Sequence, residues 1–333
     1  MANLRAIVVG FGHLGAFHAQ KYTKLAGEGV ELVALVDPRA EEVRAKAEKT
    51  APGVPLFTSL QEYFAACEAG KARKPDIASI ASTTEHHLSI AEHLLARGVH
   101  LLVEKPLASS QAEARRLVEL ADAKKLTLAT GHVQRHLVVE ALKGMRGQPY
   151  FIECHRLSPF PARSTDIDVV FDLMIHDIDL MLAMVESPLK EVHSAGFPVL
   201  TPQIDIANCR FEFESGCVAN LTSSRISMSR TRKFRIFCAD SYLSLDLGAG
   251  TFERYVRVAG ETDLAKAISV ENGSFGVEDA LLEEIRDFVR SVRDSRAPLV
   301  SGRDGLRAIE VAEQVVADAR RRLDRLSVGG QGC

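Results

Sequence analysis

The chain has 333 residues, with 41 lysine and arginine residues against 44 acidic residues, a net charge of -3 and an isoelectric point near 6.4. It has neither a basic tail nor a long run of like charge, which argues against nucleic acid or an anionic membrane as its main partner and favours small solutes. No apolar stretch approaches the roughly 18 to 20 residues that cross a bilayer, so we expect a cytoplasmic protein without a membrane partner.

The length exceeds what one hydrophobic core usually serves, which predicts two domains. We expect them at residues 1–131 and 132–333, for the reasons given below. The six cysteines form no CxxC pair and show no zinc-type spacing with the eleven histidines, so we expect reduced thiols and no metal site.

The stretch AIVVGFGHLG, residues 6–15, predicts a buried parallel strand that enters a glycine-rich turn and then a helix. Gly10 permits the tight turn, Gly12 lets a pyrophosphate approach the backbone, and Gly15 lets the helix pack close to the strand. Free N–H groups at the start of that helix attract phosphates. A second predicted strand, residues 31–36, ends where a ribose-binding acid belongs. The residues expected to bind a dinucleotide here are Gly10, Phe11, Gly12, His13, Leu14, Gly15 and Asp37.

Strands and helices alternate up to Gly131, which predicts a doubly wound parallel sheet in the first domain. Further strands are expected at 76–81, 100–103 and 127–130, and helices at 14–26, 39–50, 60–68, 85–97 and 110–125. The strand at 76–81 opens into Ser82 and Thr83 at the edge where open parallel sheets bind ligands, so we expect both residues, and His87, near the cofactor.

Beyond Gly131 strand-sized segments dominate, which predicts an α+β domain with mostly antiparallel neighbours over residues 132–333. A helix at 136–145 bridges the domains and another at 171–185 interrupts the strands, which are expected at 150–156, 191–196, 204–213, 217–226, 233–237 and 242–246. Two C-terminal helices are expected at 277–292 and 303–326. We expect them to fold back onto earlier parts of the chain, and the first domain is one alternative for where they pack.

Asp172 and His176 are four residues apart on the helix predicted at 171–185, and Asp179 continues the same stripe. A histidine oriented by a carboxylate is the usual general acid or base at neutral pH. Spacing alone also fits a structural helix start, with His176 half-buried against the sheet. A metal site is the less favoured alternative, because no third ligand is spaced to complete it.

Lys105 follows the strand predicted at 100–103 and lies between Glu104 and Pro106, at the sheet edge where ligands bind. It could donate to a substrate hydroxyl or, with a pKa lowered by burial, accept a proton. The alternative is a solvated lysine that pairs with Glu104. Pro106 restricts Lys105 to an extended backbone, and a cis bond between them is conceivable.

Three arginines, Arg135, Arg156 and Arg163, fall before or inside the expected substrate domain. Guanidinium groups suit phosphate, because their forked N–H groups match its oxygens. Ordinary surface charge is the alternative for each of them. The basic run at residues 230–233 is expected to decorate a hairpin.

The chain resembles the Gfo/Idh/MocA oxidoreductases in the order and separation of five features: GFGHLG, Asp37, the triplet Glu104-Lys105-Pro106, the helix with Asp172-x-x-x-His176, and the ending VSGRDGLRAIEVAEQV. The resemblance implies a Rossmann domain, then an α+β domain with a large open sheet, and nicotinamide-dependent oxidation of a sugar or polyol hydroxyl. It maps Lys105 and His176, with Asp172 beside it, onto the family's catalytic positions. It also implies a homo-oligomer, either a dimer or a tetramer.

Within that family, GHVQRH and residues 155–180 resemble the sugar-nucleotide branch, which oxidises the 3-hydroxyl of UDP-N-acetylglucosamine at the start of a route to the 3-amino sugars of some lipid A. Arg135, Arg156 and Arg163 then become candidates for contacts to pyrophosphate or uridine, with Asp172 and His176 at the sugar. One alternative keeps the fold but oxidises a free polyol such as an inositol. Another is a catalytically silent NAD-bound sensor or assembly subunit, against which the intact catalytic set argues.

The expected cofactor is NAD, because Asp37 would accept hydrogen bonds from both ribose hydroxyls and would repel a 2'-phosphate. Arg39 leaves some room for NADP. Glu104 and Lys105 complete the expected cofactor-binding residues. Either Lys105 or His176 would take the proton of the oxidised hydroxyl, and the sequence does not choose between them.

Overall fold

The computed structural model describes residues 3–143, 145, 147–160, 166–263, 266–276 and 279–329. The chain divides into two compact units, of which unit 1 contains residues 1–136 and 277–306 and unit 2 contains residues 137–276 and 307–333. Two helices, α6 (Gln134–Leu142) and α9 (Gly302–Gly329), run from unit 1 into unit 2 along the sequence. No helix in the described ranges is long and apolar enough to cross a membrane.

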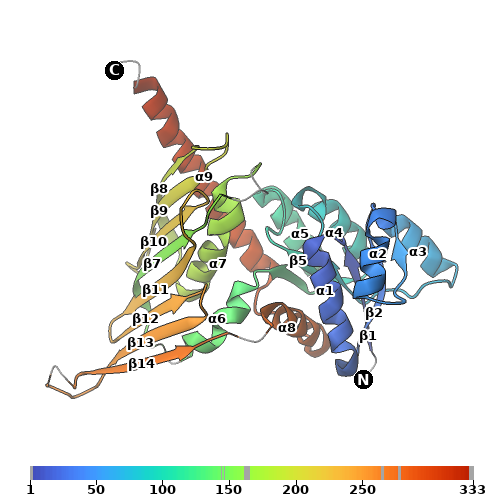
Figure 1. The fold of residues 1–333 in the computed structure, drawn as a ribbon, viewed down its shortest axis with the longest axis horizontal. Coiled ribbons are helices and arrows are strands. Elements are labelled where there is room, and N and C mark those ends of the chain that lie inside the picture. The colour runs from blue at the N-terminus through green and yellow to red at the C-terminus, as the bar shows by residue number, and fades with distance from the viewer. Residues whose placement is uncertain are drawn as a thin grey trace. The chain divides into compact units, whose positions relative to one another are not determined.

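Unit 1 is built on a six-stranded parallel sheet in the order β3-β2-β1-β4-β5-β6. Figure 1 labels β1, β2 and β5 of this sheet. The reversal of strand order beside β1 is a switch point, and ligands of open α/β sheets bind at the carboxyl ends of the strands there. The fold class predicted for this part of the chain is confirmed. The strands are β1 (Leu4–Val9), β2 (Val30–Val36), β3 (Leu56–Phe57), β4 (Ile77–Ile80), β5 (His100–Glu104) and β6 (Leu128–Gly131).

Helices cover both faces of this sheet. Tyr22 of α1 and Phe288 of α8 share one buried apolar cluster with Val8 of β1, so these two helices cover the same face. Helix α4 packs beside α5. Ser59 and Ser110 cap α3 and α5 by accepting a backbone N–H from the first turn. The helices are α1 (His13–Lys24), α2 (Ala40–Thr50), α3 (Leu60–Glu68), α4 (His87–Leu95), α5 (Gln111–Lys124) and α8 (Ala280–Asp294), with 3-10 turns at Leu25–Glu28 and Thr84–His86.

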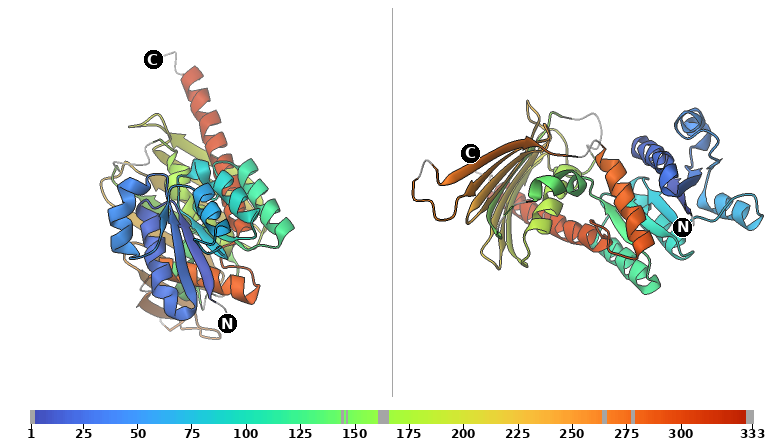
Figure 2. Two further views of the ribbon diagram at one scale, coloured as in Figure 1. Left: turned by 90° about the vertical axis from the view of Figure 1, so that its right-hand side faces the viewer. Right: turned by 90° about the horizontal axis from the view of Figure 1, so that it is seen from below.

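Unit 2 contains an eight-stranded sheet in the order β14-β13-β12-β11-β7-β10-β9-β8. All neighbours are antiparallel except β7 and β10, so the predicted α+β character is confirmed. Helix α7 (Ile175–Met184) packs on β7 and β10, and α9 bonds β8 through Ser194, on the same side of the sheet (Figure 2). The strands are β7 (Pro149–Leu157), β8 (Leu189–Phe197), β9 (Ile206–Phe213), β10 (Val218–Ser224), β11 (Thr231–Cys238), β12 (Ser241–Asp246), β13 (Thr251–Arg257) and β14 (Ile268–Ser274).

Sequence analysis predicts neither β13 nor β14, nor the two-residue β3. Strand β14 lies at the edge of the sheet, is almost fully exposed and includes Gly273, so it lacks the apolar alternation by which a strand is recognised. Its pairing with β13 forms it instead. Edge strands depend on a neighbour that the local sequence does not specify.

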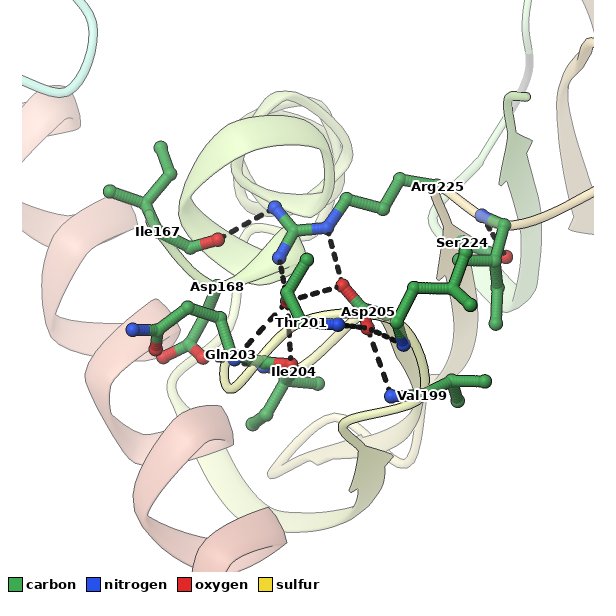
Figure 3. Close-up of polar contacts among 11 residues, drawn as sticks. Ile167, Asp168, Val199, Thr201, Gln203, Ile204, Asp205, Ser224 and Arg225 are labelled. Carbon is green, nitrogen blue, oxygen red and sulfur yellow. Dashed lines mark hydrogen bonds and ion pairs between the residues drawn. The ribbon is translucent and has the colours of Figure 1, made fainter. Parts of the chain in front are cut away.

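A buried ion pair organises the loop between β8 and β9 (Figure 3). Arg225 and Asp205 expose no side-chain surface, and Nε of Arg225 donates to Oδ1 of Asp205 over 2.8 Å. The other carboxylate oxygen accepts the backbone N–H groups of residues 199–201 at 2.7 to 2.9 Å. Burial by itself raises the pKa of Asp205, but these hydrogen bonds hold it well below its usual range.

The same cluster anchors the segment that leads into the helix predicted at 171–185. The carbonyl oxygen of Ile167 accepts a hydrogen bond from Nη1 of Arg225 at 2.7 Å, and Oδ1 of Asp168 accepts the backbone N–H of Ile204 at 2.8 Å. A buried guanidinium directly after β10, more than fifty residues further along the chain, therefore holds the segment that precedes that helix.

Replacing Asp205 by Asn should lower the free energy of unfolding by about 3 to 5 kcal/mol, because Arg225 is then buried without a countercharge. Asp246→Asn is the matched control, since that carboxylate accepts two backbone N–H groups in an exposed turn, and we expect a loss of less than about 1 kcal/mol. Urea unfolding measures both.

The pKa of Asp205 is lower in the folded state than in the unfolded state. The stabilisation that its carboxylate provides is therefore fully present above the unfolded pKa, about 3.9. The difference in unfolding free energy between wild type and Asp205→Asn should shrink as the pH falls below that value. Equal losses in the two variants would contradict this role.

Candidate active site

The glycine-rich loop between β1 and α1 packs more tightly than a larger residue would permit. Gly10 has a φ of +88°, and a Cβ there would lie 2.5 Å from the backbone nitrogen of Ser82. A Cβ on Gly15 would lie 1.8 Å from the carbonyl oxygen of Gly10. Both glycines are therefore required by the close approach of β1, β4 and α1.

Gly12 borders open space, since a Cβ added there meets no atom within 4 Å. Helix α1 begins directly after it, with no acidic residue in the first turn and no side chain that caps it. His13 and Leu14 are exposed beside it. The helix start thus fits the pyrophosphate of a dinucleotide, which would take the place of a cap. Lys46, which belongs to none of the sequence motifs, also lies at this loop, and its Nζ donates to the carbonyl oxygen of Gly12 over 2.6 Å.

Asp37 follows β2 and is 1% exposed. Its Oδ2 accepts the backbone N–H of Phe11 over 2.7 Å, and its Oδ1 accepts that of Arg39 over 2.8 Å. The Arg39 guanidinium lies 3.3 Å from Oδ1. Burial raises the pKa of Asp37, but these donors outweigh burial and keep it below its ordinary value. Asp37 is therefore an ionised acceptor held in place against the glycine-rich loop.

Glu104 and Lys105 stand where β5 ends, and the peptide bond between Lys105 and Pro106 is cis. Oε2 of Glu104 accepts the backbone N–H of Lys105 over 3.2 Å. Its Oε1 lies 2.8 Å from Nε2 of His18 in α1, which donates to it. The carboxylate thus connects Lys105 to the helix that follows the glycine-rich loop.

His18 extends this connection and was not identified from the sequence. Its Nδ1 lies 3.0 Å from the hydroxyl of Ser79 in β4, which lies 2.8 Å from the hydroxyl of Tyr22, and all three side chains are buried. Burial raises the pKa of Glu104, but His18 and Lys105 hold it below its ordinary value. Ser79, a polar residue inside the apolar run IASI, is the one sequence signal of this network. A buried polar residue needs hydrogen-bond partners, but the sequence does not reveal which residues they are.

Ser82 and Thr83 lie in the loop after β4 and are at least partly exposed. His87 is 1% exposed, and its ring nitrogens face two carbonyl oxygens, that of Pro106 at 3.1 Å and that of Ser82 at 3.2 Å. Burial lowers the pKa of His87. The hydrogen bonds to the two carbonyl oxygens raise it and so make the decrease smaller. The buried ring therefore joins the loop after β4 to the loop after β5.

Unit 1 brings the predicted cofactor residues to one edge of its sheet, because all its strands are parallel and their carboxyl ends coincide. Arg135 also belongs to unit 1 and is 9% exposed. Its Nη1 donates to Asp304 over 3.2 Å and to the carbonyl oxygen of Leu299 over 3.3 Å. The guanidinium thus contacts the start of α9.

Asp172 and His176 belong to unit 2, and both are partly exposed. The helix predicted at 171–185 is present, but its first turn, Val170–Met174, is π-helical and α7 follows it. Asp172 lies in the π-helical turn and His176 in the first turn of α7. A π-helical turn inside a helix is rare and is found frequently at functional sites. Asp179 is buried, with 1% exposure.

Arg156 of β7 is 2% exposed and makes two charged hydrogen bonds to Asp177 of α7. Its Nε lies 2.6 Å from Oδ2 and its Nη2 lies 2.5 Å from Oδ1. Burial lowers the pKa of Arg156, but Asp177 outweighs this and raises it. The pair fixes the helical turn that carries His176. Arg163, the third predicted arginine, lies outside the described residues.

Metal binding is the remaining alternative for the histidines. Within the part of the chain that the structure describes, no group of three or more histidine, cysteine or acidic side chains is placed to hold a metal ion.

Comparisons with known proteins agree with this geometry. Residues 4–132 match "Oxidoreductase family, NAD-binding Rossmann fold", and residues 140–244 match "GFO/IDH/MocA C-terminal domain". A UDP-N-acetylglucosamine 3-dehydrogenase from Acidithiobacillus ferrooxidans is 35% identical over 320 residues, which cover 95% of this chain and 97% of the relative. A solved structure of this enzyme from the same organism is 34% identical, covers 96% of this chain and 99% of its own, and has a TM-score of 0.85.

A more distant relative is a myo-inositol 2-dehydrogenase from Thermotoga maritima, 24% identical over 330 residues that cover 92% of this chain and 93% of the relative. The family resemblance seen in the sequence is confirmed by these matches. They also indicate a nicotinamide cofactor, which the open backbone at Gly12 and the ionised Asp37 fit.

Replacing Arg156 by Met should cost about 3 to 5 kcal/mol of stability, because Asp177 is left buried and unpaired. Adding Asp177→Leu should recover much of that loss, since it removes the uncompensated charge. Denaturant unfolding of the two variants measures the coupling. If Arg156 binds substrate instead, Arg156→Met should raise KM without this loss of stability, and that result would overturn the structural assignment.

Proposed function

This chain belongs to the Gfo/Idh/MocA family of oxidoreductases, and on that premise we propose that it oxidises the 3-hydroxyl of UDP-N-acetylglucosamine with NAD. The observation that carries the proposal is the 35% identity to the Acidithiobacillus ferrooxidans enzyme over nearly the full length of both chains. Inositol dehydrogenases among the relatives supply the second candidate, a free polyol.

NAD is proposed over NADP because of the surroundings of Asp37. Two backbone N–H groups hold its carboxylate, and the Arg39 guanidinium makes longer contacts of 3.3 and 3.4 Å to the same two oxygens, which the two ribose hydroxyls would replace. A 2'-phosphate would meet a buried negative charge there. Arg39 beside it is more than half exposed and is the one feature that favours NADP.

Lys105 and His176 are proposed to handle the proton of the oxidised hydroxyl, and Asp172 to orient His176. When bound, the nicotinamide accepts the hydride from the same carbon. Lys105 lies directly beside Glu104, whose carboxylate accepts its backbone N–H. His176 carries an imidazole, the side chain that most often serves as a general acid or base near neutral pH. An ammonium that donates to the hydroxyl and an imidazole that accepts its proton together fit the reaction.

A homo-oligomer is proposed because an aromatic row crosses the face of the unit 2 sheet that α7 does not cover. Its rings, on β7, β11, β12 and β13, are spaced 4.7 to 5.6 Å apart between centroids. Ile268 and Val270 are 55% and 52% exposed on the neighbouring β14. A second copy of the chain would cover this face, and sedimentation of monomers only would contradict the proposal. The rings are those of Phe151, Phe237, Tyr242 and Tyr255.

NADH formation with UDP-N-acetylglucosamine and with myo-inositol tests the substrate directly. We expect absorbance at the NADH wavelength to rise with the nucleotide sugar alone. Turnover of free inositol without turnover of the nucleotide sugar would replace the first candidate by the second.

Replacing Lys105 by Met should lower kcat by roughly 100-fold or more, because the donated proton is lost, while NAD still binds. Initial rates and calorimetric NAD titration separate these effects. Lys190→Met is the control, because Lys190 is exposed on β8, and it should keep full turnover. Undiminished turnover in Lys105→Met would remove this lysine from the mechanism.

Replacing Asp37 by Ala should reduce the preference for NAD over NADP by roughly 10- to 100-fold, as expected for the loss of charged hydrogen bonds to the ribose. The ratio of kcat/KM for the two cofactors measures it. An unchanged ratio would refute the role of Asp37.

A further inference from the structure

Arg232 lies on the inner face of the unit 2 sheet, the face that carries α7. It is directly opposite Arg156 in the antiparallel pair of β7 and β11. Phe234 and Ile236, which share its face because side chains alternate along a strand, are both fully buried. The hairpin expected around residues 230–233 is present, since β11 begins at Thr231 and pairs antiparallel with the next strand, β12, but Arg232 lies on its inner face.

The charge of Arg232 has no carboxylate partner within the described residues. Asp177 lies near enough to act on it, but both oxygens of that carboxylate already bond Arg156. Partial burial lowers the pKa of Arg232, and the positive charges of Arg156 and Arg230 lower it further. The fold thus keeps a half-buried guanidinium next to two other cations.

Arg235 lies on the same strand but faces the opposite side of the sheet, and unlike Arg232 it has a carboxylate partner. Its Nη1 donates to Glu153 of β7 over 2.9 Å. Holding a partly desolvated cation without such a partner costs free energy, so an arginine in this position suits an anion that the described residues do not supply.

We propose that Arg232 binds a phosphate oxygen of the diphosphate in a nucleotide-sugar substrate. The inference rests on the proposed function and names the residue that recognises the anionic half of that substrate. Asp177 directly follows His176 in α7, so Arg232 lies near the helical turn that carries the proposed acid–base group. Its forked N–H groups match the geometry of phosphate oxygens.

Kinetics of Arg232→Gln test the contact, with Arg235→Gln as the matched control on the opposite face. We expect the KM for UDP-N-acetylglucosamine to rise roughly 10- to 100-fold in Arg232→Gln, with the KM for NAD and kcat close to wild type. Arg232→Lys should recover part of the loss, because it keeps the charge without the fork. An unchanged KM in Arg232→Gln, with an active wild-type enzyme, would overturn the inference.

Thermal unfolding without substrate separates binding from a structural role. Because Arg232 is an uncompensated cation, its replacement by Gln should leave the Tm unchanged or raise it. A clear fall in Tm would show that Arg232 stabilises the fold, and it would count against the proposal.

Calorimetric titration of the NAD-loaded enzyme with UDP separates failure of this inference from failure of the proposed function. If the wild type binds UDP and Arg232→Gln binds it at least tenfold more weakly, the phosphate contact stands even when UDP-N-acetylglucosamine is not oxidised. If both proteins bind UDP equally, or neither binds it, the contact is refuted.

Discussion

The ion pair between Arg225 and Asp205 has no exposed surface, and it is kept only because the fold supplies every partner that the two charges need. Taking an ion out of water costs several kcal/mol unless it is paired and hydrogen-bonded. Both units obey this constraint. Asp37 is held by two backbone N–H groups, and Asp177 receives both hydrogen bonds of Arg156. Compensated charges therefore determine where the loops and helix starts of the site lie.

The network below Lys105 applies the same rule to the cofactor edge of unit 1. Glu104 is compensated by His18, which belongs to the helix that starts at the glycine-rich loop. One buried carboxylate therefore links that helix to the backbone of Lys105. Hydride and proton transfer need reacting groups held within fractions of an ångström, and a fully bonded interior network provides that rigidity.

Short segments of sequence were sufficient to predict those elements whose structure depends only on neighbouring residues. The strand, glycine-rich turn and helix at residues 6–15 follow from the backbone freedom of Gly10 and the lack of a side chain at Gly15. The π-helical turn around Asp172 was not predicted, because helical periodicity does not distinguish it from an α-helical turn. Strand β14 was missed because its exposed residues carry no apolar pattern.

The sequence by itself determined the fold class, the family and the order of all elements except β3, β13 and β14, because these depend on apolar periodicity, glycine positions and motif spacing within short segments. Only the tertiary structure decided which charges meet. Arg156 and Arg232 look alike in the sequence, yet one is neutralised by Asp177 and the other, directly across the same strand pair, is not. Pairing across strands and helices brings together residues that are distant in the chain, and no local pattern specifies which of two neighbouring cations will find the carboxylate.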